Sequence, residues 1–274
     1  MANSIVDCVA ARCEFQQIRQ TLWVLLCTRQ QVRSGGYSKI KHAFITGVST
    51  GIGAGLTDCL LADGWRVYGL SRRVPEQFRS DEFSHVPCDL AQCDEIPDCL
   101  SQLLGDVGAL DLVVLNAAVF GTVQHLDVDT IENLTSIMQV NVWSNKAIFD
   151  WLFANLATVT QVVTMSSGAA IHAMAGWGGY SISKAALDML TRVYAAEHPD
   201  THITSLAPGI VDTAMQEYLC ETVDAKKYPT VNQLRNARGT ERMPDIPTGA
   251  RMLYDVFPKL LAGESGRYVD IRNP

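Results

Sequence analysis

A tyrosine and a lysine stand four residues apart at Tyr180 and Lys184, a spacing that puts both side chains on one face of a helix. A phenol titrates at about 10, and a neighbouring ammonium stabilises the phenolate and lowers that pKa. Such a pair is suited to giving a proton to an oxygen atom. An ordinary helix surface pair has the same spacing, so its meaning depends on the surrounding sequence.

Two more polar residues stand where chemistry is expected. Ser167 comes just after a predicted strand at 161–165, so it lies at the carboxyl edge of a sheet, where ligands bind in α/β folds. Its hydroxyl can polarise a carbonyl group by hydrogen bonding. Asn141 falls inside a predicted helix at 130–155, where asparagine is a poor helix former unless it has another task. That task is either catalytic or structural, in which case the amide is buried and forms hydrogen bonds within the protein.

A glycine-rich loop, Thr46 to Gly53, follows the first predicted strand and opens the first predicted helix. Glycines at Gly47, Gly51 and Gly53 allow a tight turn whose backbone N–H groups approach a pyrophosphate, and the helix N-terminus adds partial positive charge. The spacing is G-x-x-x-G-x-G rather than the common G-x-G-x-x-G. A turn that binds no ligand is the alternative interpretation.

The second predicted strand, 65–70, is followed by Ser71, Arg72 and Arg73. A site for NAD normally places Asp or Glu at this strand end to bind the ribose 2′-hydroxyl. Two arginines instead suit a 2′-phosphate through charge-assisted hydrogen bonds. The sequence therefore favours NADP(H), although a pair of solvated surface arginines would look the same.

The elements that must position these residues alternate along the chain. Continuous apolar runs bounded by turns are typical of parallel strands that are buried on both faces. We expect a single α/β domain with a doubly wound parallel sheet, a Rossmann fold, of about seven strands with helices on both faces. The predicted strands are 43–47, 65–70, 84–88, 110–115, 161–165, 202–206 and 268–271, and the predicted helices are 52–63, 130–155, 178–197 and 247–261. The segment 214–246 is polar, and we expect it to be irregular.

Charge divides the 274 residues into two unlike pieces. Residues 1–41 carry six basic and two acidic side chains, whereas the whole chain has a net charge of −7. We therefore expect a flexible N-terminal extension at 1–41 and a catalytic domain at 42–274. The acidic balance disfavours nucleic acid as a partner.

The eight cysteines include no C-x-x-C pair and no Cys/His cluster with the spacing of a zinc site, so no metal is expected. The longest apolar run near the start, 22–27, is six residues long, whereas a membrane-spanning helix needs about 20. These features predict a cytoplasmic protein with reduced thiols and no membrane span.

Together these motifs resemble the short-chain dehydrogenase/reductase family, from about residue 42 to the C-terminus. The resemblance implies that Asn141, Ser167, Tyr180 and Lys184 form a catalytic tetrad, in which Asn141 keeps a water molecule in a proton relay to Lys184. One departure is Ala118, where the family usually has glycine after Asn-Ala. The N-terminal extension is not a family feature either.

The resemblance also implies a set of contacts to NADP(H). Cys88-Asp89-Leu90 matches the segment that contacts adenine, and Pro208 to Thr213 matches the turn that contacts the nicotinamide half. The expected cofactor-binding residues are Gly47, Ser49, Thr50, Gly51, Ile52, Gly53, Arg72, Arg73, Asp89, Leu90, Asn116, Ala117, Tyr180, Lys184, Pro208, Gly209, Val211 and Thr213.

Several segments are similar to one branch of that family, the sepiapterin and benzil reductases. They include 167–170, Gly176-Trp177, 184–189, 212–216 and 265–270. This similarity implies that Ser167, Trp177 and Asp270 contact the substrate, with Asp270 in the place of an acid that anchors a pterin.

The resemblance leads us to expect NADPH-dependent reduction of a small-molecule ketone or vicinal dicarbonyl, with Tyr180 as the proton donor. Two alternatives stay open: an alcohol dehydrogenase or reductase for a sugar, steroid or acyl thioester, and a non-catalytic NADP-binding sensor. Family members pair through their two long helices, here 130–155 and 178–197, so a homodimer or homotetramer is expected.

Overall fold

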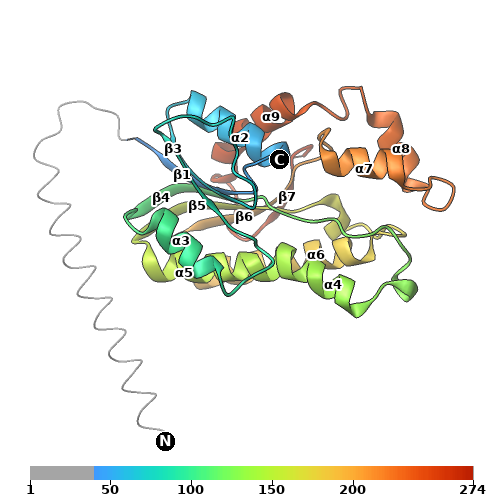
Figure 1. The fold of residues 1–274 in the computed structure, drawn as a ribbon, viewed down its shortest axis with the longest axis horizontal. Helices are drawn as coiled ribbons and strands as arrows, with labels where there is room; N and C mark the ends of the chain where they lie inside the picture. The colour runs from blue at the N-terminus through green and yellow to red at the C-terminus, as the bar shows by residue number, and fades with distance from the viewer. Residues whose placement is uncertain (1–39, 274) are drawn as a thin grey trace, which may run out of the picture. The chain divides into compact units, whose positions relative to one another are not determined.

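The computed structural model describes residues 40–273 (Figure 1). The predicted N-terminal extension therefore lies outside the described residues except for its last two. Its boundary with the catalytic domain stays a prediction.

Seven parallel strands form one sheet in the order β3-β2-β1-β4-β5-β6-β7 (Figure 1). Side chains of the central strands are buried on both faces, as the unbroken apolar runs of the sequence require. This arrangement confirms the predicted doubly wound α/β fold. The strands are β1 (His42–Thr46), β2 (Arg66–Ser71), β3 (Phe83–Pro87), β4 (Ala109–Leu115), β5 (Thr158–Met165), β6 (His202–Ala207) and β7 (Tyr268–Asp270).

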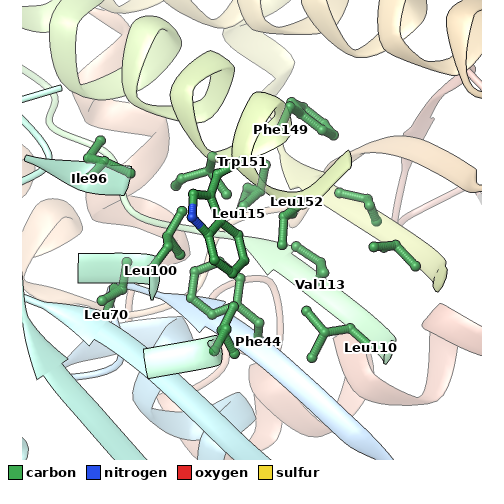
Figure 2. Close-up of a cluster of buried hydrophobic side chains, with 14 of the residues drawn as sticks. Phe44, Leu70, Ile96, Leu100, Leu110, Val113, Leu115, Phe149, Trp151 and Leu152 are labelled. Atoms are coloured by element: carbon green, nitrogen blue, oxygen red, sulfur yellow. The ribbon is translucent and has the colours of Figure 1, made fainter. Parts of the chain in front are cut away.

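Helices cover both faces of the sheet (Figure 1). On one face lie α2 (Gly51–Ala62) and α9 (Ile246–Leu260), and on the other lie α3 (Ile96–Leu104), α5 (Ser144–Asn155) and α6 (Gly178–Glu197). Figure 2 shows the second interface, where Phe44 and Val113 of the sheet lie beneath Trp151 of α5. One cluster of buried apolar side chains lies on each face of the sheet and packs it against the helices. This packing fixes the carboxyl ends of the strands, from which the loops of the site extend.

The strand order reverses between β1 and β4. After β1 the chain runs outward to β2 and β3, and then crosses back to pair β4 with the other side of β1. Ile45 of β1 is paired with both Gly69 and Val114, so the loops after these strands start at the same level. In open α/β sheets such a reversal leaves a crevice at the carboxyl ends of the strands.

The predicted helix 130–155 is present but is not uniform. It consists of α4 (Ile131–Met138), a π-helical turn (Gln139–Trp143) and α5. Asn141 lies in the π-helical turn. Such turns widen a helix by one residue and are frequent at functional sites.

The expectation of an irregular segment at 214–246 was wrong. This segment contains α7 (Ala214–Thr222) and α8 (Thr230–Ala237), whose inward side chains Leu219 and Val231 are buried. Arg235 binds the end of α7, because its Nε donates to the carbonyl oxygen of Cys220 at 2.6 Å. Of the charged residues in this segment, Glu217, Glu221 and Arg235 lie in the two helices and are exposed, and the others lie in the turns that follow each helix. This density of charge obscured the apolar period in the sequence.

The cysteines of the described part, Cys59, Cys88, Cys93, Cys99 and Cys220, are free thiols. Among the helices of residues 40–273, none has the length and apolar character needed to cross a membrane.

Candidate active site

A cavity of about 560 Å³ opens at the carboxyl edge of the sheet. Every cofactor contact expected from the sequence lines it, except Gly53. Ser167 and Trp177, two of the expected substrate contacts, line it as well. The structure therefore brings the glycine loop, the two arginines and the tyrosine–lysine pair into one continuous site.

Gly53 lies behind the loop and makes the turn possible. A Cβ atom on Gly53 would lie only 2.3 Å from the carbonyl oxygen of Gly47, so a larger residue would push α2 away from the turn. Gly51 has φ +63°, which favours glycine. The side chain of Thr50, at the start of α2, makes no capping hydrogen bond, so it leaves the N–H groups of the first turn to a ligand. These features fit a bound pyrophosphate.

Asn116 ties the end of β4 to the end of β1. Its Nδ2 donates to the carbonyl oxygen of Thr46 at 2.9 Å, and its backbone N–H donates to Oγ1 of Thr46 at 3.0 Å. Asn116 also lines the cavity, as expected, but its amide is used to fix the floor beneath the glycine loop.

Arg72 and Arg73 line the cavity beyond the end of β2, and both are exposed. Ser71 fixes this turn, because its hydroxyl donates to the carbonyl oxygen of Arg73 at 2.8 Å. Within residues 40–273 neither guanidinium forms an ion pair, so both remain available to an anion. Asp89, which follows β3 and also lines the cavity, accepts a hydrogen bond from the backbone N–H of Ala91 at 3.1 Å.

Tyr180 lies in the first turn of α6 with its ring buried. Burial raises the pKa of Tyr180 to about 12, and a hydrogen bond with Ser167 opposes that rise. The phenol is therefore protonated at neutral pH and can give up a proton. The Ser167 hydroxyl also accepts the backbone N–H of Ala169 at 3.1 Å, which orients it within the cavity wall.

Lys184 is buried one helical turn after Tyr180. Its Nζ donates to the carbonyl oxygen of Met165 at 2.6 Å and lies 5.6 Å from the centre of the Tyr180 ring. Burial lowers the pKa of Lys184 to about 8, and the charge of Asp188 opposes that effect. The hydrogen bond with Ser167 lowers the pKa of Tyr180 in this geometry. The expected effect of the Lys184 cation on the phenolate of Tyr180 stays a prediction.

Asn141 is buried behind the cavity rather than in its wall. Its Oδ1 accepts from the backbone N–H of Val119 at 2.8 Å, and its Nδ2 donates to the carbonyl oxygen of Val119 and to Oγ of Ser183, each at 2.9 Å. The side chain expected to keep a water molecule is thus occupied by protein groups. It joins the loop after β4 to α6, the helix that carries Tyr180.

The wall beside Tyr180 is aromatic. Phe120 stacks on the Tyr180 ring, with centroids 4.6 Å apart and planes at 23°, and Trp177 meets Phe120 edge-on at 4.9 Å and 83°. Met215 and Leu219 of α7 complete the apolar lining. Sequence reasoning missed Phe120, although an aromatic residue just beyond the end of β4 could have indicated it.

Asp270, the third expected substrate contact, does not line this cavity. Its Oδ1 accepts from Nε of Arg272 at 2.8 Å, and this bond lowers the pKa of Asp270. Its contact with substrate stays a prediction. As for metals, the described part of the chain contains no group of three or more His, Cys, Asp or Glu side chains placed to hold an ion.

The chain is similar to a known protein family and to several of its members. The model of the short chain dehydrogenase family matches residues 41–224. The (S)-benzoin-forming benzil reductase of Bacillus subtilis is 28% identical over 241 residues, which are 83% of this chain and 97% of that protein. Sepiapterin reductase of Meriones unguiculatus is 38% identical over 109 residues, 40% of each chain.

An uncharacterized oxidoreductase of Saccharomyces cerevisiae, YIR035C, is 28% identical over 248 residues, covering 85% of this chain and 96% of that protein. Its crystal structure superposes with a TM-score of 0.76, covering 85% of this chain and 97% of that chain at 26% identity. The chain belongs to the short chain dehydrogenase family, whose enzymes act on CH–OH and C=O groups.

Proposed function

We propose that this protein reduces a ketone or vicinal dicarbonyl to an alcohol with NADPH. The observation that carries the proposal is that Tyr180 and Ser167 line the same cavity as Lys184 and the glycine loop. Benzil reductases among the relatives support carbonyl reduction as the reaction class.

The cofactor fits the residues that line the cavity. The N–H groups at the start of α2 would bind the pyrophosphate, and Arg72 and Arg73 would bind the 2′-phosphate. The same cavity is lined by Tyr180, Lys184, Pro208, Gly209, Val211 and Thr213, and the nicotinamide half would lie against these residues. Bound NADPH supplies the hydride for the carbonyl carbon.

The residues of this chain position the substrate and supply the proton. Ser167 donates a hydrogen bond to the substrate oxygen and holds it beside Tyr180. As the carbonyl carbon gains hydride, Tyr180 transfers its phenolic proton to that oxygen, so that the product is a neutral alcohol. The Lys184 cation stabilises the phenolate that remains until a proton from solvent restores Tyr180. Asn141 acts through its contacts, because it holds the Val119 loop against α6.

The walls of the cavity favour a substrate with an aromatic group. A carbonyl oxygen placed between Ser167 and Tyr180 leaves one substituent against Phe120 and Trp177, whose rings offer a flat apolar surface. An aryl ketone or aryl dicarbonyl fits this surface better than a sugar, which would leave its hydroxyl groups without partners.

A substrate panel tests this proposal. Aryl 1,2-diketones, pterins, sugars and acyl thioesters are each offered with NADPH, and NADPH consumption is recorded. We expect the aryl diketones to give the highest kcat/KM. Turnover of the sugar or the acyl thioester alone would contradict the proposal, and binding of NADPH without turnover of any class would favour a sensor. A cytoplasmic location stays a prediction from the sequence.

We infer further that α6 pairs with a second copy of the chain, in a homodimer or homotetramer. Ile182, Met189 and Val193 lie along one stripe of this helix and are exposed. In a twofold pair this stripe would be buried against its own copy. Met189→Glu should convert the oligomer to monomers in light scattering, whereas Met252→Glu on α9 should leave the mass unchanged.

A further inference from the structure

A second buried charge lies one helical turn beyond Lys184. Asp188 follows Lys184 by four residues on α6, so Tyr180, Lys184 and Asp188 share one face of the helix. Lys184 is 3% exposed and Asp188 is 7% exposed. An ionised group is expensive to bury unless it is paired or hydrogen-bonded. The reaction described above gives Asp188 no task.

Residues at the ends of two neighbouring strands form hydrogen bonds with the side chains of Lys184 and Asp188. The Ser205 hydroxyl on β6 donates to Oδ1 of Asp188, and Nζ of Lys184 donates to the carbonyl oxygen of Met165 on β5. β5 and β6 are paired at this level, with Thr164 opposite Ser205. Ser205 therefore fixes the carboxylate of Asp188, whose charge acts on Lys184, and Asp188 does not line the cavity.

The two charges stabilise each other against burial. Burial lowers the pKa of Lys184 to about 8, and the charge of Asp188 opposes this. Burial raises the pKa of Asp188, and the surrounding hydroxyls and cations oppose that. The groups that face Asp188 are Lys184 and Arg192 on α6, Ser166 after β5, Ser205 on β6 and Tyr268 on β7.

We propose that Asp188 is a positioning residue for the reduction: its buried carboxylate keeps Lys184 a cation at the pH at which the enzyme works. The proposal rests on the proposed function for the task of Lys184. Without the negative charge, the buried amine would lose its proton at lower pH. Tyr180 would then lack the positive charge that stabilises its phenolate.

Asp188→Asn tests the proposal, since the amide oxygen still accepts from Ser205 while the charge is gone. The titration of Lys184 is measured directly in the full-length, cofactor-free protein by NMR of ¹³C-labelled lysine. The Lys184 signal is assigned by its loss in Lys184→Met. We expect the midpoint to fall by roughly one pH unit, as for loss of a unit charge several ångströms away. The alkaline limb of the pH profile of kcat/KM for reduction should move by the same amount. Asp188→Glu keeps the negative charge, so its Lys184 midpoint should lie close to that of the unaltered protein.

Two controls separate charge from structure. Ser205→Ala removes the hydrogen bond but keeps the carboxylate, and Glu197→Gln removes an exposed charge on the same helix. Both should leave the Lys184 midpoint unchanged. Should Asp188→Asn not fold, Asp188→Ser makes the same comparison with a smaller side chain.

An unchanged Lys184 midpoint in a folded Asp188 variant that lacks the charge would overturn the proposal. This titration needs no turnover. It therefore gives its answer even if the proposed reduction is wrong, and that failure would appear separately as turnover retained in Tyr180→Phe.

Discussion

The ring of Phe120 stacks on the ring of Tyr180 at 4.6 Å, the tightest aromatic contact of the cavity wall. Phe120 comes from the loop after β4, and Tyr180 from the start of α6. Asn141 holds the same loop through the backbone of Val119 and holds α6 through Ser183. The aromatic stack and the hydrogen bonds of Asn141 thus fix Tyr180 against the edge of the sheet.

Phe120→Leu keeps an apolar side chain of similar volume but removes the aromatic ring against which an aryl substrate would pack. We expect kcat/KM for an aryl ketone to fall about three- to tenfold more than for its alkyl analogue, because stacking contributes about 0.5–1.5 kcal/mol. Paired steady-state kinetics on the two ketones measures this. Phe83→Leu, at an aromatic contact on β3 outside the cavity, serves as the control. Equal losses for both ketones would contradict an aromatic substrate wall.

Arg72→Ala and Arg73→Ala should each weaken NADPH binding about tenfold, because each removes a charge-assisted hydrogen bond to the 2′-phosphate. NADH lacks this phosphate, so its Kd should stay the same. Fluorescence titration of the two cofactors gives both constants. Arg79→Ala, an exposed arginine outside the cavity, is the matched control. A parallel loss of NADH affinity would mean that the arginines do not select the phosphate.

Asn141→Ala should lower the free energy of unfolding by about 3 kcal/mol, since it leaves backbone groups of Val119 and the Ser183 hydroxyl with one partner fewer in a buried site. Urea denaturation measures the loss. Asn155→Ala, which removes an exposed amide at the end of α5, should cost less than about 1 kcal/mol. A stability equal to that of the unaltered protein would show that the Asn141 contacts are not formed.

The rate of reduction should fall as pH rises above about 8. Burial holds the pKa of Lys184 at about 8, so the lysine is a cation below that pH and neutral above it. Tyr180, with its pKa raised to about 12, keeps its proton throughout this range. A profile of kcat/KM from pH 6 to 10 should therefore be level and then decline about tenfold per pH unit. A level profile up to pH 10 would contradict the need for the Lys184 cation.

Much of the fold could be predicted from local patterns. The helix predicted at 178–197 has those bounds in the structure, because its apolar period extends over the whole segment. The glycine loop also follows β1 as predicted, since a strand, a glycine turn and a helix form one local unit.

The rest depends on contacts between segments far apart in the chain. Nothing near Asn141 in the sequence indicates that its amide binds the backbone of Val119. The two helices of 214–246 were not predicted because the ten charged side chains of this segment obscured the narrow apolar stripe of each helix. Spacing alone put Lys184 beside Tyr180, but only the folded sheet reveals its bond to Met165.

Tyr180→Phe is the decisive variant for the proposed proton transfer, because it removes one oxygen atom and keeps the ring that stacks on Phe120. We expect turnover of the best carbonyl substrate to fall at least about a hundredfold, the range that general acid catalysis contributes. The Kd for NADPH should stay within about twofold, because the phosphate contacts lie elsewhere in the cavity. Near-normal turnover in Tyr180→Phe would contradict Tyr180 as the proton donor.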